Sequence, residues 1–274
     1  MPSLPTIEKD VERKAATASD HGAFDAPAVQ HDDPPLFDYL CRLGDDALVL
    51  GQRLSEWCGH APALEVDLSL ANLALDLIGQ GTNLLGLAGD ADKLAFHRDV
   101  LDYKNCILVE QPNGDFAQTI ARQLLFSTWQ HMLYERLQAS SHEGIAAVAA
   151  KGVKEVAYHR ELAADWTIRL GDGTEESAQR MRDGLDWCWR FVPELFEVDE
   201  VLCGLIERGV AIDPMSFYDD YRAAIGKVLD EAQLCAPPDQ RPILGGRRGH
   251  HSEHLGHLLA VMQYLPRTYP DATW

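Results

Sequence analysis

The stretch KEVAYHRE, residues 154–161, places an acidic side chain and an imidazole four positions apart. In an α-helix, residues at i and i+4 share a face, so Glu155 and His159 would point in the same direction. Carboxylates and imidazoles on facing helices are the ligands of di-iron centres inside four-helix bundles. A carboxylate and an imidazole on one helical face are half of what such an oxygen-activating centre would need.

Polar side chains recur at helical spacing on three further segments. Such stripes are usually solvated faces, but these segments are apolar over much of their remaining circumference, which favours an inward orientation. An unpaired buried charge is costly, so we predict that some of these side chains hydrogen-bond to one another across a bundle. The alternative is that each one caps a helix or is solvated locally. The predicted vestigial polar core comprises Gln52, Glu56, Asp76, Gln123, Glu155 and His159.

The ligand spacing that a di-iron bundle requires is nevertheless absent from the sequence. Two of its helices supply one Glu each and two supply Glu-x-x-His, with the acid three residues before the imidazole. None of the 11 histidines has Asp or Glu at that position. The second segment offers DLIG, where glycine stands in place of histidine, and Glu155 is followed three residues later by Tyr158. The sequence therefore predicts no catalytic residue, no metal ligand and no cofactor in this chain.

The elements that carry these side chains are predicted to be helices. Apolar residues recur at intervals of three and four from Leu36 to Trp57, and the same spacing resumes after Pro62. Long helices with short connections predict an all-α fold, a ferritin-like four-helix bundle with additional packed helices. The expected helices cover about 36–57, 62 onward, 115–138, 143–170, 174–196, 198–208, 214–233 and 251–265.

Composition predicts the domain organisation and the compartment. Residues 1–35 are rich in Ala, Pro and Asp, which predicts a disordered N-terminal tail ending at Pro34–Pro35, before a helical domain over 36–274. The formal net charge of −19 argues against nucleic acid and against an anionic membrane as partner. The six cysteines form no C-x-x-C pair, and no apolar run reaches the roughly 18 residues of a membrane span. These features predict a cytoplasmic protein.

The stretch GGRRGHHSEHLGH, residues 245–257, is a second place where chemistry could occur. Adjacent arginines on a flexible loop before a helix suit an anion or a partner's acidic groups, and a solvated loop is the alternative. Histidines at i and i+3 could share a metal ion, but a polar helix start capped by Ser252 or nearby groups is the favoured interpretation. The candidates for a partner or anion contact are Arg247, Arg248, His251, Glu253 and His254.

Several long stretches of the chain carry a family resemblance. They are CRLGDDALVLGQRLSEWCGHAP, DLSLANLALDLIGQ, LVEQPNGDFAQTIARQ, KEVAYH, RLGDGTEES, WRFVPELFEVDE and GGRRGHHSEHLG, the last followed by MQYL. From about Leu36 to Trp274 the chain resembles the non-catalytic C-type subunits of the bacterial phenylacetyl-CoA 1,2-epoxidases. The matching stretches are spread over the whole globular part, and only the segment before Leu36 lies outside them.

The resemblance implies a ferritin-like structural subunit of a hetero-oligomeric monooxygenase complex in phenylacetate catabolism. In that family a related catalytic subunit holds the di-iron centre and the acyl-CoA pocket, and it epoxidises the ring with O₂. The implied partners are this catalytic subunit, the other subunits of the complex and an NADPH-fed reductase. The residues leave one alternative open, a divergent carboxylate-bridged di-iron oxidase that uses Glu56, Asp76, Glu155 and His159.

Overall fold

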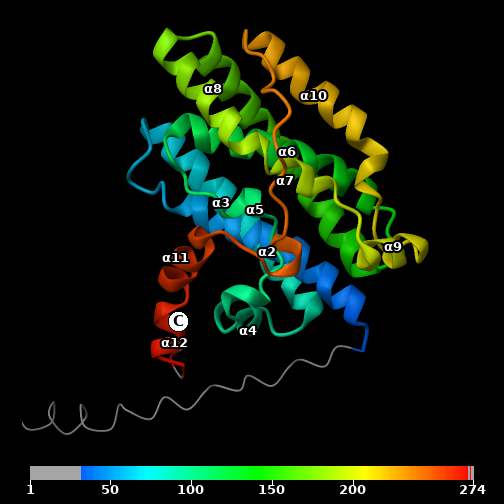
Figure 1. Cartoon of the computed structure of the whole chain (residues 1–274). Coiled ribbons are helices and arrows are strands. Elements are labelled where there is room, and N and C mark those ends of the chain that lie inside the picture. The colour runs from blue at the N-terminus through cyan, green and yellow to red at the C-terminus, as the bar shows by residue number, and fades with distance from the viewer. Residues whose placement is uncertain (1–31, 271, 273–274) are drawn as a thin grey trace, which may run out of the picture. The chain divides into compact units, whose positions relative to one another are not determined.

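Four long helices form the centre of the computed structural model, which describes residues 32–270 and 272 (Figure 1). They are α2 (Pro34–Ser55), α3 (Leu64–Ala88), α6 (Phe116–Leu137) and α7 (Glu143–Gly171). Helix α2 packs along α3 and α6 packs along α7, while α3 contacts α7 and so joins the two pairs. Short connections make the members of each pair antiparallel. The predicted all-α bundle is confirmed, and the described residues contain no strand.

The first helix begins earlier than the sequence pattern predicts. Asp33 is its N-cap, and the Asp33 carboxylate accepts a hydrogen bond from the backbone N–H of Leu36 at 3.3 Å. Pro34 and Pro35 occupy the first turn, where a missing N–H costs little because those donors have no partner within the helix. The doubled proline therefore opens a helix instead of ending a tail. Residues 1–31 of the predicted tail lie outside the described residues.

Shorter helices pack around the bundle (Figure 1). Helices α8 (Glu175–Trp189) and α10 (Tyr218–Glu231) contact the α6–α7 pair, whereas α9 (Glu200–Glu207) and α11 (Glu253–Met262) contact α2. The predicted helix over 174–196 is too long, because a 3-10 turn with Pro193 in its first turn follows α8. None of the helices in the described ranges is long and apolar enough to cross a membrane. The remaining elements are α4 (Ala91–Phe96), α5 (Ile107–Glu110), α12 (Tyr264–Thr268) and 3-10 turns at Val100–Asp102, Val192–Phe196, Pro214–Phe217 and Gly246–Arg248.

Helix α2 is buried along most of its length and on most sides. Leu40, Leu50 and Leu54 have no exposed surface, and the charged residues Asp45 and Asp46 are at most 1% exposed. The helix contacts α3, α5, α9 and α11, which makes it the central element of the fold. Because it is enclosed, each charge that it carries needs a partner from a neighbouring segment.

Three glycines allow α2 and α3 to approach closely. A Cβ at Gly81 would lie 3.1 Å from the carbonyl oxygen of Gly44 on the facing helix, and a Cβ at Gly44 would lie 2.8 Å from the side chain of Leu85. A Cβ at Gly51 would lie 2.9 Å from the side chain of Ile78. The separation of the two helices therefore depends on the missing side chains, because close-packed interiors leave no spare room.

Replacing Gly81 with valine should destabilise the fold. The branched side chain would meet the backbone of α2, and overpacking of this kind costs about 1–3 kcal/mol. Gly86→Ala is the matched control on the same helix, because its Cβ would meet open space. Alanine there should raise the free energy of unfolding by about 0.5–1 kcal/mol. Urea denaturation followed by circular dichroism measures both changes, and equal stability of the two variants would contradict the close approach.

Candidate functional site

Polar side chains line the interior of the bundle where α3, α6 and α7 meet. Helix α3 contributes Asp76 and Gln80, α6 contributes Gln130, and α7 contributes Glu155 and His159. Asp76 and Gln80, like Glu155 and His159, are four residues apart and therefore share a helical face. The side chain of His159 is fully buried, and Gln80 and Gln130 are each 3% exposed. We call these five residues the bundle network.

Direct hydrogen bonds link the bundle network across three helices. Nε2 of His159 lies 3.1 Å from Oδ2 of Asp76, and Nε2 of Gln80 donates to Oε2 of Glu155 at 2.8 Å. Oε1 of Gln80 accepts a hydrogen bond from Nε2 of Gln130 at 3.1 Å. These contacts satisfy polar groups that burial would otherwise leave without water. Of the six candidates in the polar core, the structure joins Asp76 and His159 directly, whereas Glu155 bonds separately to Gln80.

The other three polar-core candidates lie outside the bundle network. Glu56 is exposed at the end of α2, where it pairs with Arg53 at 2.8 Å and accepts a hydrogen bond from Asn113 at 3.0 Å. Assigning Glu56 to the polar core is therefore wrong, because it makes local contacts at the helix end. Gln52 is half-buried and makes no hydrogen bond to any described residue. Gln123 is 1% exposed, and neither of its amide atoms has a partner among the described residues.

The predicted polar core lacks both glutamines of the bundle network, Gln130 and, more consequentially, Gln80. It connects α3 to both other helices, whereas the predicted polar core includes only the glutamines Gln52 and Gln123. The spacing could have predicted Gln80 as a member of this polar face, because it follows Asp76 by four residues.

The donor groups of the bundle network do not fit a di-iron centre. Only Asp76, Glu155 and His159 could act as charged or imidazole ligands, whereas such a centre draws four carboxylates and two imidazoles from four helices. Nε2 of His159 is already engaged by Asp76, and Glu155 is held by an amide. In the part of the chain that the structure describes, no group of three or more His, Cys, Asp or Glu side chains is arranged to hold a metal ion. What these residues do is hold three helices together.

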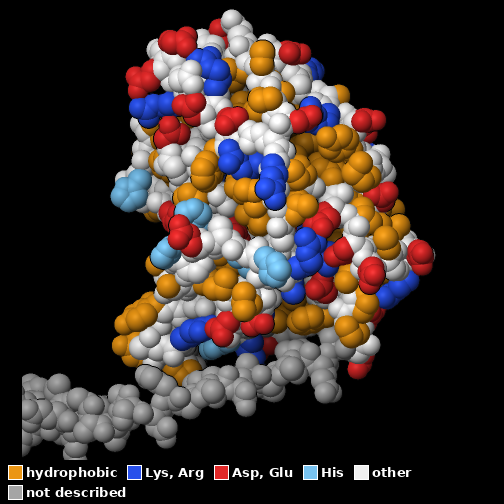
Figure 2. All heavy atoms as spheres, viewed as in Figure 1, with side chains coloured by type: hydrophobic (Ala, Val, Ile, Leu, Met, Phe, Trp, Pro, Cys, Tyr) orange, Lys and Arg blue, Asp and Glu red, His pale blue; other side chains and the backbone are white. Residues whose placement is uncertain are grey.

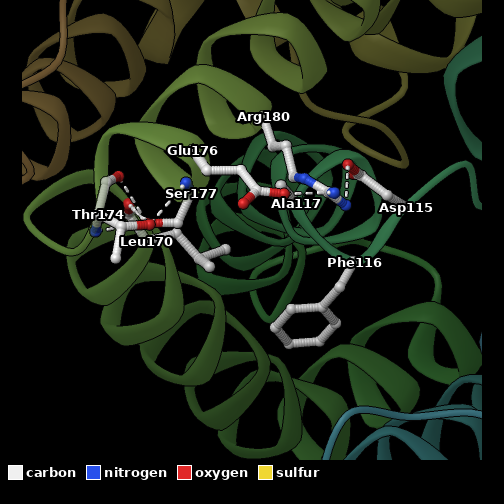
Figure 3. Close-up of a pocket in the computed structure, with 8 residues that line it drawn as sticks. All are labelled: Asp115, Phe116, Ala117, Leu170, Thr174, Glu176, Ser177 and Arg180. Carbon is white, nitrogen blue, oxygen red and sulfur yellow. Dashed lines mark hydrogen bonds and ion pairs between the residues drawn. The ribbon is translucent and has the colours of Figure 1, made fainter.

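A separate pocket of about 240 Å³ opens where the start of α6 meets the end of α7 and the start of α8 (Figure 3). Phe116 contributes an apolar wall. The guanidinium of Arg180 pairs with the carboxylates of Asp115 at 3.6 Å and Glu176 at 2.7 Å, as the dashed lines in Figure 3 show. No imidazole or thiol is among its lining residues. Its one guanidinium is thus held by two carboxylates of the same lining, and the pocket marks a junction of helix ends.

Arg247 is buried, which corrects its assignment to a flexible surface loop. Its guanidinium lies 2.8 Å from Oδ2 of Asp46 on α2 and donates to the carbonyl oxygen of Lys104 at 3.1 Å. Burial acts to lower the pKa of Arg247, but the charge of Asp46 raises it above its ordinary value. The prediction that Arg247 contacts an external anion or partner is therefore wrong, because it binds a carboxylate of its own chain.

The imidazole of His251 is held between a carboxylate and the backbone. Its Nδ1 lies 2.7 Å from Oε2 of Glu110, and its Nε2 lies 2.9 Å from the carbonyl oxygen of Tyr103. Both ring nitrogens face acceptors, an arrangement that a doubly protonated imidazolium satisfies. Burial acts to lower the pKa of His251, but the hydrogen bond and charge of Glu110 raise it above its ordinary value. With both nitrogens engaged, His251 does not fit a metal site shared with His254, and that alternative is wrong.

Arg248, Glu253 and His254 surround this buried segment. Arg248 is exposed and pairs with Glu197 at 2.5 Å, Glu253 is exposed, and His254 is half-buried. The start of α11 is fixed from outside the helix, since the carboxylate of Glu110 accepts the backbone N–H of Ser252 at 2.6 Å. Ser252 is the N-cap residue, but its hydroxyl makes no capping bond within the described residues. Of the five C-terminal candidates, these three lie nearest the surface.

Truncating Arg247 should be strongly destabilising. Arg247→Ala would leave Asp46 buried and unpaired, and breaking a buried pair in this way costs about 3–5 kcal/mol. Arg248→Ala is the matched control, because it removes only a partly exposed pair and should cost less than about 1 kcal/mol. Guanidinium-induced unfolding gives both free energies. A loss at Arg247 no larger than the loss at Arg248 would refute the buried ion pair.

The His251–Glu110 pair should make stability depend on pH near neutrality. Because folding raises the pKa of His251 above its unfolded value of about 6.5, the stabilisation is fully present below about pH 6.5 and is lost as pH rises through the folded pKa. The gap in unfolding free energy between wild type and His251→Gln should therefore be largest near about pH 6 and shrink at higher pH. His257→Gln, at an exposed histidine of α11 that forms no ion pair with a described residue, is the control for the loss of an imidazole. A gap that is constant across this range would contradict a charged pair.

Comparison with known proteins places the helical bundle in a family. A family model described as "Phenylacetic acid catabolic protein" matches residues 24–274. The chain is 48% identical over 242 residues to the C-type subunit of 1,2-phenylacetyl-CoA epoxidase from Escherichia coli (strain K12), and this match covers 86% of the chain and 98% of that protein. The all-α architecture agrees with the ferritin-like fold of the family. The chain therefore belongs to the family of phenylacetic acid catabolic proteins.

Proposed function

We propose that this chain is a structural, non-catalytic subunit of a phenylacetyl-CoA 1,2-epoxidase complex in phenylacetate catabolism. It binds and supports a di-iron catalytic subunit, which performs the reaction. The similarity to the C-type subunit of the Escherichia coli epoxidase supports this role over nearly the full length of that relative. The observation that carries the proposal is the bundle network, whose donor groups do not fit a di-iron centre.

The bundle network supports a role as a rigid scaffold. In a metal-binding bundle, ions tie the helices together, and their binding free energy contributes to folding. Here the side chains of α3, α6 and α7 contact one another directly, so the arrangement of these helices needs no ion. A scaffold of this kind can present a fixed surface to a catalytic partner without carrying a reactive group.

The proposed assembly is a hetero-oligomer in the cytosol. Besides the catalytic subunit, it contains the remaining subunits of the complex and works with an NADPH-fed reductase. All six cysteines are free, as expected for a protein in a reducing compartment. The net charge of −19 favours protein partners over nucleic acid or an anionic membrane.

Co-expression with the cognate catalytic subunit should give a complex that survives size-exclusion chromatography. Oxidation of phenylacetyl-CoA by the reconstituted system should fall to near background when this chain is omitted, because the catalytic subunit then lacks its scaffold. NADPH consumption coupled to product formation measures the effect. Full epoxidase activity in the absence of this chain would contradict the proposal.

The iron content of the purified chain distinguishes the proposed structural subunit from the alternative, a divergent di-iron oxidase. After incubation with ferrous iron under reducing conditions, the chain purified alone should retain close to none, because its donors do not fit. The catalytic subunit treated in parallel is the positive control. About two irons per chain, the content of a di-iron bundle, would overturn the proposal and make this subunit an oxygen-activating protein.

A further inference from the structure

The outer face of α3 carries a row of exposed apolar residues. Leu64, Leu68 and Leu75 are 72%, 58% and 66% exposed, and their spacing of four and seven residues places them on one stripe. Gly79 and Gly86 continue this stripe, and a Cβ at either position would meet open space. Large apolar side chains exposed along one helical face are the kind of surface that binds another protein. We call these five residues the α3 face.

The charges on α3 are all of one sign. Its 25 residues contain Glu65, Asp67 and Asp76 but no lysine or arginine. Solvated surfaces normally intersperse both signs of charge. The α3 face is therefore apolar with acidic neighbours, and it complements an apolar surface that carries positive charge.

A pocket of about 100 Å³ opens beside the middle of the α3 face, between α3 and α7. Leu75 and Gly79 line it from the α3 side, and Gly152 lines it from α7. Asp76 and Glu155 also belong to its lining residues. The pocket thus joins the exposed leucines to the acidic members of the bundle network.

In the carboxylates of Asp76 and Glu155, one oxygen contacts a side chain of the bundle network and the other has no hydrogen-bond partner among the described residues. Oδ2 of Asp76 contacts His159, and Oε2 of Glu155 accepts from Gln80, while the second oxygen of each makes no hydrogen bond to a described residue. Lys151 is the one lysine or arginine in the lining, and it is exposed and forms no ion pair within the described ranges. Two available carboxylate oxygens suit the ammonium or guanidinium end of a partner's side chain, which forms charge-assisted hydrogen bonds.

A second copy of this chain is a poor match for the α3 face. Two copies would bring together surfaces whose charges have the same sign, on chains that each carry a net charge of −19. Like charges placed opposite one another oppose association. The occupant is therefore a different protein whose contact surface is apolar and locally basic.

A second apolar surface lies at the C-terminal end of the chain, over α11 and α12 (Figure 2). It includes Val261 and Tyr264, which are 81% and 64% exposed. Neither of the two pockets described above is lined by these residues. This surface serves as the rival site against which the α3 face can be tested.

We propose that the α3 face docks a helix of the di-iron catalytic subunit, one that presents apolar side chains and a lysine or arginine. The basic side chain enters the pocket and pairs with Asp76 and Glu155, while Gly79 and Gly86 let the partner helix approach closely. This docking rests on the proposed function, because it takes the catalytic subunit as the partner.

Affinity for the purified catalytic subunit, measured by isothermal titration calorimetry with the full-length chain, tests the site. The double variant Leu68→Arg/Leu75→Arg should bind at least about tenfold more weakly, because central apolar anchors carry most of the energy of an interface. Val261→Arg, at the rival surface, is the matched control and should bind like wild type. Thermal melts of both variants verify that they are folded.

The charge of the partner's side chain is tested at a single position. Leu75→Asp and Leu75→Arg both remove the leucine, but only the arginine places a like charge where the basic side chain must enter. Leu75→Arg should therefore bind several-fold more weakly than Leu75→Asp, and the gap should narrow as salt is raised. Equal affinities at low salt would overturn the pocket as the site of a basic side chain.

The outcomes separate this docking from the proposed function. If wild type does not bind the catalytic subunit, the proposed function itself fails. If wild type binds and the folded double variant binds equally well, or if Val261→Arg is the variant that loses binding, only the α3 face is overturned. Ultracentrifugation showing a wild-type homodimer that the double variant dissociates would assign the face to a second copy and also overturn the proposal.

Discussion

The buried charges of α2 are the constraint on which the rest of the fold depends. A charge enclosed in protein and left without a partner costs several kcal/mol, so groups from elsewhere in the chain must meet each one. The contacts join Asp45 to Arg98, Asp46 to Arg247, Arg42 to Asp199, and Arg53 to the carbonyl oxygens of Glu110 and His254. The segment after α4, the start of α9 and the C-terminal segment are thereby fixed to one helix. This explains why a motif rich in arginine and histidine is used inside the molecule.

The central helices are also held together by direct contacts between their own side chains. The bundle network joins α3, α6 and α7 through one amide–amide hydrogen bond and two contacts to carboxylates. The buried ion pairs of α2 are separate from it, because their partners Arg98, Asp199 and Arg247 belong to none of these three helices. Two sets of polar contacts therefore hold different parts of the fold together.

A helix can be predicted from the sequence when its own residues carry a regular pattern, such as a repeated spacing of apolar residues. Apolar periodicity locates α2 and α3, because their residues repeat the same spacing over many turns. The short helices α4 and α5 have no such repeat; α5 is positioned by distant carboxylates, since Asp46 accepts the N–H of Cys106 and Glu194 accepts that of Ile107. The residues around Arg247 and Glu56 likewise do not reveal that Arg247 is buried and that Glu56 is exposed. Whether a charged side chain is buried depends on its partner, which periodicity does not reveal.

The two acids of the bundle network also line a pocket. Oδ2 of Asp76 contacts His159 and Oε2 of Glu155 contacts Gln80, and both residues line the pocket beside the α3 face. The pocket opens between α3 and α7 beside Gly79, where a Cβ would meet open space. Acids at these positions therefore have a physical use without iron: they tie α3 to α7 and offer charge to a docked partner.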